Sequence, residues 1–208
     1  MGRIIDNPYD RLPLNDKNIG NYILSSELNV QPFLQENFAE LEEDCVFTSI
    51  VTCIHYFYPE IATPQDIYNV AVAIYRREFP SFQNIKGVVP FTIKHIYGEV
   101  YKFFKLHYYS IKSKYVNQIG FNYNTIKRQI DQGIPVIMSM YNDGRQFYKN
   151  HTVTIIGYMK FQMDNLDPFI KYINPKKEKQ ILMVYDNWST EVRYIDFKKI
   201  SLFSSIVF

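Results

Sequence analysis

The chain has 208 residues, of which 47% are hydrophobic and 17% aromatic, so its composition predicts a folded core and excludes an intrinsically disordered protein. Its 23 basic and 21 acidic residues give a net charge of +2, which is too small to favour nucleic acid as an electrostatically captured partner. We expect a single domain over residues 1–208, and no apolar run reaches the roughly 18 residues of a membrane-spanning helix.

The N-terminal part of the chain is polar and rich in turn residues. Residues 1–30 contain Pro8, Pro13 and Gly20, which favour an irregular segment, and residues 29–38 resemble a short extended entry into the domain. This segment has no apolar core of signal-peptide length, so we expect a cytoplasmic protein.

A helical pattern begins at Cys45. Apolar side chains follow at i, i+3, i+4, i+7 and i+11 spacing and form one stripe, until Pro59 ends the helix. A second helix is expected from Thr63, a predicted N-cap followed by Pro64 at the first helical position. Further helices are expected over residues 90–104 and 124–132, the latter ended by Gly133.

Strand patterns replace the helical ones after Gly133. Four apolar or alternating runs are predicted to be strands, and the short links between them favour antiparallel pairing: 134–140, 151–161, 180–186 and 191–197. The helices therefore precede the sheet, which predicts an α+β fold.

The two cysteines of the chain, Cys45 and Cys53, lie on the same predicted helix. Eight residues of helix separate them by about 12 Å, which is beyond disulfide reach. Two cysteines and four scattered histidines form no zinc pattern, so we expect no metal. Cys45 opens the helix, where the partial positive charge of the backbone N–H groups stabilises a thiolate, whereas Cys53 suits a buried core position. A buried role remains the alternative for Cys45 as well.

Two later positions could assist a cysteine nucleophile. His151 is the first residue of a predicted strand, and histidine is the usual base for a thiol. Asp186 closes an apolar strand in "VYDNWST" and could orient an imidazole, although an ordinary strand-to-turn Asp-Asn pair is the alternative. If the strand continues through Asn187, side-chain alternation lets only one of Asp186 and Asn187 meet the imidazole.

The order Cys, His, Asp, with the cysteine opening a helix and the other two on a following sheet, resembles the papain-like cysteine peptidases. The closer resemblance is to their bacterial branch of bacteriocin-processing (double-glycine-leader) peptidases. That branch has a glutamine upstream of "DC", an "xxGxPVI" strand, a "GHxVxxxGY" strand and then an aspartate. This chain has "PFLQ", "DCVFTS", "IDQGIPVIMSM", "NHTVTIIGY" and "VYD", over roughly residues 32–197.

The resemblance implies a papain-like fold, in which an N-terminal helical half packs on a C-terminal antiparallel sheet. It implies Cys45 as nucleophile, His151 as base and Asp186 as orienting residue of a catalytic triad, with a peptide or protein as substrate and no cofactor. It also implies Gln35 as an oxyanion-hole donor. Trp188, in a "DNW" that is similar to the "N-x-W" of papain-like enzymes, is expected to shield the His–Asp hydrogen bond, with Asn187 beside it in support.

Two other functions remain open. The same fold could pass the acyl group to an amine, as a transferase or deamidase does. The chain could also be a binding module with a decayed site, because Val46 stands where the family has glycine, Phe47 replaces a small residue, and acidic residues 42–44 precede the cysteine.

Overall fold

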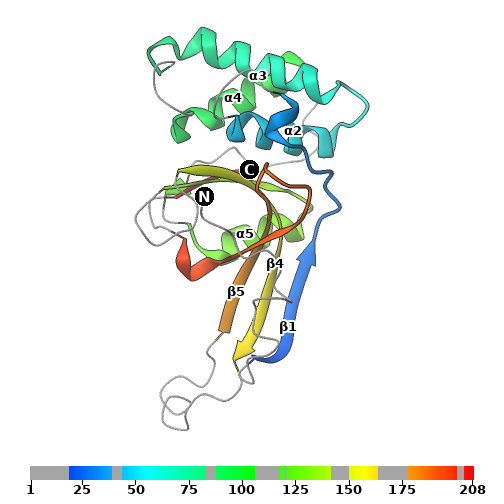
Figure 1. The fold of residues 1–208 in the computed structure, drawn as a ribbon, viewed down its shortest axis with the longest axis vertical. Coiled ribbons are helices and arrows are strands. Elements are labelled where there is room, and N and C mark those ends of the chain that lie inside the picture. The colour runs from blue at the N-terminus through cyan, green and yellow to red at the C-terminus, as the bar shows by residue number, and fades with distance from the viewer. Residues whose placement is uncertain are drawn as a thin grey trace.

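The structure is a computed structural model that describes residues 19–38, 44–82, 88–105, 118–119, 121–141, 150–163, 178–200 and 204–208. Three helices form a layer at one end of the molecule, the sheet lies beneath them, and a fourth helix lies on the opposite side of the sheet (Figure 1). The helices are α2 (Cys45–Phe57), α3 (Pro64–Glu78), α4 (Pro90–Phe103) and α5 (Tyr123–Asp131). The predicted α+β fold, with its helical half before the sheet, is confirmed. None of the described helices is long and apolar enough to cross a membrane.

Two of the described helices, α3 and α5, begin at a residue whose side chain accepts a hydrogen bond from one of the first backbone N–H groups. Thr63 caps α3 through a reciprocal pair of bonds with Asp66, and Pro64 occupies the first turn, as the sequence predicts. Asn122 caps α5 by accepting a hydrogen bond from Thr125 N. Gly133 follows α5 at φ +77°, a left-handed conformation that glycine adopts without steric cost. Short 3₁₀ helices complete the helical elements: η1 (Gln35–Asn37), η2 (Pro80–Phe82) and η3 (Phe197–Lys199).

One sheet contains all the described strands, and every pairing in it is antiparallel. The order is β2-β7-β3-β4-β5-β6, and β1 pairs with β4 outside this path. The strands are β1 (Ile19–Glu27), β2 (Gln118–Ile119), β3 (Val136–Met140), β4 (His151–Met163), β5 (Glu178–Tyr185), β6 (Arg193–Asp196) and β7 (Ser205–Val207). The four predicted strands correspond to β3–β6 and are adjacent in the predicted order.

The prediction that residues 1–30 are irregular is wrong for β1, because Ile19–Glu27 form a strand. The strand β5 occupies one edge of β4 from Thr154 to Gln162. The other edge is shared, since β3 pairs with its first half and β1 with its second half (Figure 1). The β1 segment is thus held by an edge of β4 that its local pattern does not reveal.

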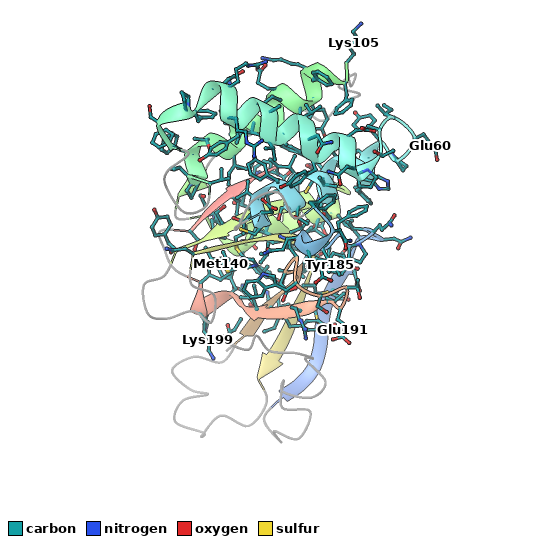
Figure 2. The ribbon with its side chains drawn as sticks, turned by 45° about the horizontal axis from the view of Figure 1, so that its top comes forward. Glu60, Lys105, Met140, Tyr185, Glu191 and Lys199 are labelled. Carbon is teal, nitrogen blue, oxygen red and sulfur yellow. The ribbon has the colours of Figure 1, made fainter. Side chains whose placement is uncertain are left out.

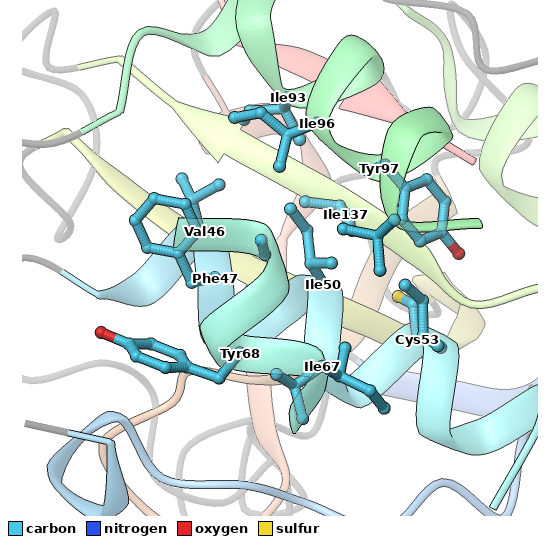
Figure 3. Close-up of a cluster of buried hydrophobic side chains, with 14 of the residues drawn as sticks. Val46, Phe47, Ile50, Cys53, Ile67, Tyr68, Ile93, Ile96, Tyr97 and Ile137 are labelled. Atoms are coloured by element: carbon cyan, nitrogen blue, oxygen red, sulfur yellow. The ribbon is translucent and has the colours of Figure 1, made fainter. Parts of the chain in front are cut away.

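The sheet has an apolar core on each face. On the helical side, Val46, Phe47 and Ile50 of α2 pack with α3, α4 and Ile137 of β3 (Figure 3). On the other side, Met138 of β3 belongs to the cluster that buries α5. Successive side chains of a strand point to opposite faces, which explains why β3 is buried along its whole length and reads as a continuous apolar run.

Gly157 in β4 lies directly against the backbone of β1. A Cβ atom at this position would lie 2.6 Å from the backbone oxygen of Ser26 and 3.0 Å from the Met183 sulfur. We expect Gly157→Ala to lower the free energy of unfolding by about 1–3 kcal/mol, the usual cost of overpacking, because the β1 backbone has to move. Urea unfolding measures this change. Ser26→Ala removes a side chain but not the backbone oxygen, so it should have little effect; an equal loss in both variants would contradict the steric explanation.

Candidate active site

Cys45 is the first residue of α2 and follows Asp44, the N-cap residue. Asp44 contributes its backbone oxygen, which accepts hydrogen bonds from both Thr48 N and Thr48 Oγ1. The first N–H groups of a helix have no acceptor within it, so the Cys45 N–H lies outside the helical hydrogen-bond ladder. The Cys45 side chain is largely buried, at 9% exposure. The predicted helix start is therefore confirmed.

Val46 and Phe47, which depart from the family pattern, have side chains in the helical core. Both are 1% exposed, and Figure 3 shows them in the same cluster as Ile50, Tyr68 and Ile96. Their bulk is accommodated between helices. The acidic residues Glu42 and Glu43 lie outside the described residues.

His151 is the first residue of β4, as predicted, and is 5% exposed. Its Nε2 atom lies 2.7 Å from the backbone oxygen of Asp186. A carbonyl oxygen can only accept, so Nε2 carries the proton. In the neutral imidazole, Nδ1 is then the unprotonated nitrogen that can serve as a base.

Trp188 covers this histidine. The two rings stack with centroids 4.0 Å apart and an interplanar angle of 23°. Trp188 follows the end of β5, which pairs with β4 as far as Thr154, so the segment after β5 brings its ring over His151 at the start of β4. Figure 2 labels Met140 and Tyr185, which end the two strands flanking the start of β4. Trp188 is 51% exposed, so its outer part reaches the surface beside the imidazole.

Asp186 meets His151 through its backbone, and its carboxylate stabilises the turn that follows. Oδ1 accepts hydrogen bonds from Trp188 N and Ser189 N, each at 3.1 Å, and Oδ2 lies 3.7 Å from Arg193 Nε. The alternation argument does not apply here, because β5 ends at Tyr185 and not at Asp186. Its premise, a strand through residue 187, is wrong.

Asn187 is fully buried and has a φ of +63°. Its side-chain Nδ2 atom donates toward Cys45 O at 2.9 Å and toward Thr152 O at 3.0 Å. Cys45 and the residue after His151 are therefore joined by one side chain. The sequence suggested only a supporting role for Asn187, and no local motif signals this contact between distant segments.

Gln35 lies beside the same residue. It begins η1, and its backbone N donates a hydrogen bond to Asn187 O at 2.9 Å. Its side-chain oxygen is buried and has no hydrogen-bond partner among the described residues. The structure thus places the predicted oxyanion residue next to the turn that holds Cys45 and His151.

The remaining thiol and histidines have other environments. Cys53 is fully buried, and desolvation raises the pKa of its thiol. His55 packs edge-on against Phe33, while the imidazole of His95 pairs with Glu78; His107 lies outside the described residues. Within the part of the chain that the structure describes, no three His, Cys, Asp or Glu side chains are grouped to hold a metal ion.

Burial lowers the pKa of His151 to about 4, and the hydrogen bond to the Asp186 backbone only partly opposes this effect. The imidazole is therefore neutral at pH 7. The folded-state pKa is lower than the unfolded value near 6.5, so the unfolded state takes up the proton first as the pH falls. The contribution of His151 to the free energy of unfolding therefore falls as the pH is lowered from about 6.5 to about 4.

We expect this group to contribute a loss of about 3 kcal/mol between pH 7 and pH 4, from a shift of roughly two and a half pKa units. Urea unfolding at several pH values measures it, and His151→Gln should flatten the pH dependence over this range. Trp188 is the single tryptophan and stacks on the imidazole, so its fluorescence should report the titration directly. A fluorescence midpoint near pH 6.5 would contradict the buried, neutral histidine.

Comparison with known proteins gives one family. The model of the Peptidase_C39 like family matches residues 27–200, well over half of the chain. The match begins at the end of β1 and extends beyond β6, so it includes every residue of the site described above. No curated protein matches the chain.

Proposed function

We propose that this chain, which belongs to the Peptidase_C39 like family of papain-like cysteine peptidases, hydrolyses a peptide or amide bond by acyl transfer through Cys45. The observation that carries this proposal is the hydrogen bond between His151 Nε2 and the Asp186 carbonyl. It leaves Nδ1 of a neutral imidazole as the base, and Asn187 joins the strand of that imidazole to the helix of the thiol.

In the proposed reaction, Nδ1 of His151 takes the thiol proton of Cys45 as the sulfur attacks the substrate carbonyl carbon. A tetrahedral oxyanion and an imidazolium form together. The imidazolium then gives its proton to the leaving amine as the carbon–nitrogen bond breaks, which leaves a thioester. Water, deprotonated by the neutral imidazole, attacks the thioester and releases the acid and the thiol.

The developing oxyanion needs hydrogen-bond donors. We propose two donors, the Cys45 N–H at the start of α2 and the Gln35 side-chain amide. The first belongs to the nucleophile itself, and Gln35 bonds Asn187, whose side chain contacts Cys45 O. Donors already in place stabilise the transition state without rearrangement during the reaction. Asp186 holds the imidazole by its carbonyl, and Trp188 limits the access of water to one face of the ring.

The finer proposal concerns the substrate. The resemblance of "GIPVIMSM" and "HTVTIIGY" to the bacteriocin-processing branch makes a peptide with a Gly-Gly sequence before the cleaved bond the first substrate to test. A peptide of the same length with Ala-Ala at these positions is the matched control.

The test is to trap the acyl-enzyme. The protein is mixed with a peptide ester, quenched in acid and examined by intact mass and peptide mapping. A peptidase should carry the acyl group on Cys45 and lose it to water. Loss only to an added amine would indicate a transferase, and an ordinary, unacylated thiol would indicate a binding module; either result would overturn the proposed hydrolysis.

A further inference from the structure

Asn187 joins three segments that lie far apart in the sequence. Its backbone oxygen accepts a hydrogen bond from Gln35 N, and its side chain reaches Cys45 O in α2 and Thr152 O in β4. A third acceptor, Ser49 Oγ, lies 3.0 Å from the same nitrogen, one helical turn after Cys45. The amide therefore lies at the junction of the oxyanion segment, the nucleophile's helix and the base's strand.

The position of Asn187 follows from the way in which the β4–β5 ladder ends. The last paired residues are Thr154 and Tyr185, and continuing their register two residues further places Asn187 opposite Thr152. The chain has left the strand by then, since Asn187 adopts φ +63°. Asparagine tolerates this left-handed conformation better than most residues. Its side-chain amide, in place of a further ladder pair, then donates to Thr152 O.

The surroundings of the amide make its hydrogen bonds strong and its direction well defined. Asn187 is 0% exposed, while Ser49 and Thr152 are 0% and 4% exposed. The NH₂ group has two protons to donate. Two of the oxygens that face it are carbonyls, which can only accept, and the third is the Ser49 hydroxyl, which can also accept. Water does not compete for hydrogen bonds in such a buried site. Separating α2 from β4 would therefore leave buried polar groups unsatisfied.

We infer that Asn187 is the positioning residue of the site, which holds the Cys45 end of α2 against the His151 end of β4. It acts through the backbone on either side and not on the substrate. This role rests on the proposed function, since it concerns the distance between the proposed nucleophile and base. A displacement of about 1 Å in such a pair can cost on the order of 10²-fold in rate.

The test uses Asn187→Gly, because glycine accepts φ +63° and keeps the carbonyl that bonds Gln35, so only the amide is lost. The measurement is the rate of Cys45 alkylation by iodoacetamide as a function of pH. We expect wild-type Cys45 to react at pH 6–7, below the usual thiol pKa, because the neutral Nδ1 of His151 can take the thiol proton as the sulfur attacks. The variant should react about 10–100-fold more slowly at pH 6–7, with an inflection moved toward pH 8.5.

The matched control is Thr154→Val, which also removes a fully buried polar group from β4, one without a hydrogen-bond partner among the described residues. It should keep the wild-type profile, so a general loosening of the fold is separated from loss of positioning. A wild-type profile with an inflection near 8.5 would overturn the proposed function itself. A depressed wild-type inflection that Asn187→Gly leaves unchanged would overturn only the positioning role.

A second measurement needs no variant and applies if Asn187→Gly does not fold. In the wild type, the side-chain N–H protons of Asn187 should exchange with solvent slowly by ¹⁵N-edited NMR, since they are buried and bonded. Exposed Asn37 in η1 provides the comparison. Exchange at Asn187 as fast as at Asn37 would overturn the inference.

Discussion

Cys45→Ala is expected to abolish hydrolysis while the protein remains folded. Loss of a covalent nucleophile removes the whole acyl-transfer route, which costs on the order of 10⁶-fold in kcat in a serine peptidase. The side chain is small and lies at the start of α2, so alanine leaves the packed stripe of the helix in place. Peptide cleavage followed by mass spectrometry measures the activity, and thermal unfolding checks the fold.

Cys53→Ala is the matched control, because it changes the other cysteine of the same helix. Cys53 is fully buried, and its thiol pKa is raised by desolvation, so it should not react. The variant should retain activity with a modest loss of stability. In the native wild type, brief iodoacetamide treatment should label Cys45. Equal labelling of Cys53, or full activity in Cys45→Ala, would show that the chemistry lies elsewhere.

Gln35→Ala is expected to lower kcat by about 10²–10³-fold, the usual effect of removing one oxyanion-hole donor, with little change in KM. The interaction strengthens as negative charge develops on the substrate oxygen, so its loss affects the transition state more than the bound substrate. The position of the segment should be kept, because the backbone N of residue 35 still bonds Asn187 O. Steady-state kinetics with a cleaved peptide measures both constants.

Two further variants sharpen this experiment. Gln35→Glu keeps the size of the side chain but places an acceptor where a donor is needed, so it should cost at least as much in kcat. Glu36→Ala changes the exposed neighbour in η1 and should be nearly silent. An unchanged kcat in Gln35→Ala would mean that another group stabilises the oxyanion, whereas a change in KM alone would assign Gln35 to substrate binding.

The helical half could be predicted from local pattern. The apolar stripe from Phe47 and the Thr63–Pro64 start of α3 are properties of short segments, since the helical period and the cap depend on residues within one or two turns. The starts of α2 and β4 were predicted to the residue. The chain order of Cys45, His151 and Asp186 predicted a shared site, because it resembles that of a known family.

The strands that the sequence did not reveal are held by distant partners. β1 pairs with the second half of β4, and β2 and β7 pair with each other. Two- and three-residue strands carry too little periodicity to recognise. In each case the partner lies far along the chain, and no local rule relates the two segments.

The sequence by itself determined the helices, the four strands β3–β6 and the residue types proposed for the site, since these depend on periodicity, capping and motif order. Only the tertiary structure decided which atoms each of these groups contacts. It gave the hydrogen bond of His151 to the backbone of Asp186, assigned the Asp186 carboxylate to the following turn, and made Asn187 the link between Cys45 and Thr152. It also buried the imidazole, which lowers its pKa. The physical reason is that hydrogen-bond direction and desolvation depend on atoms from several segments, and folding alone sets their distances.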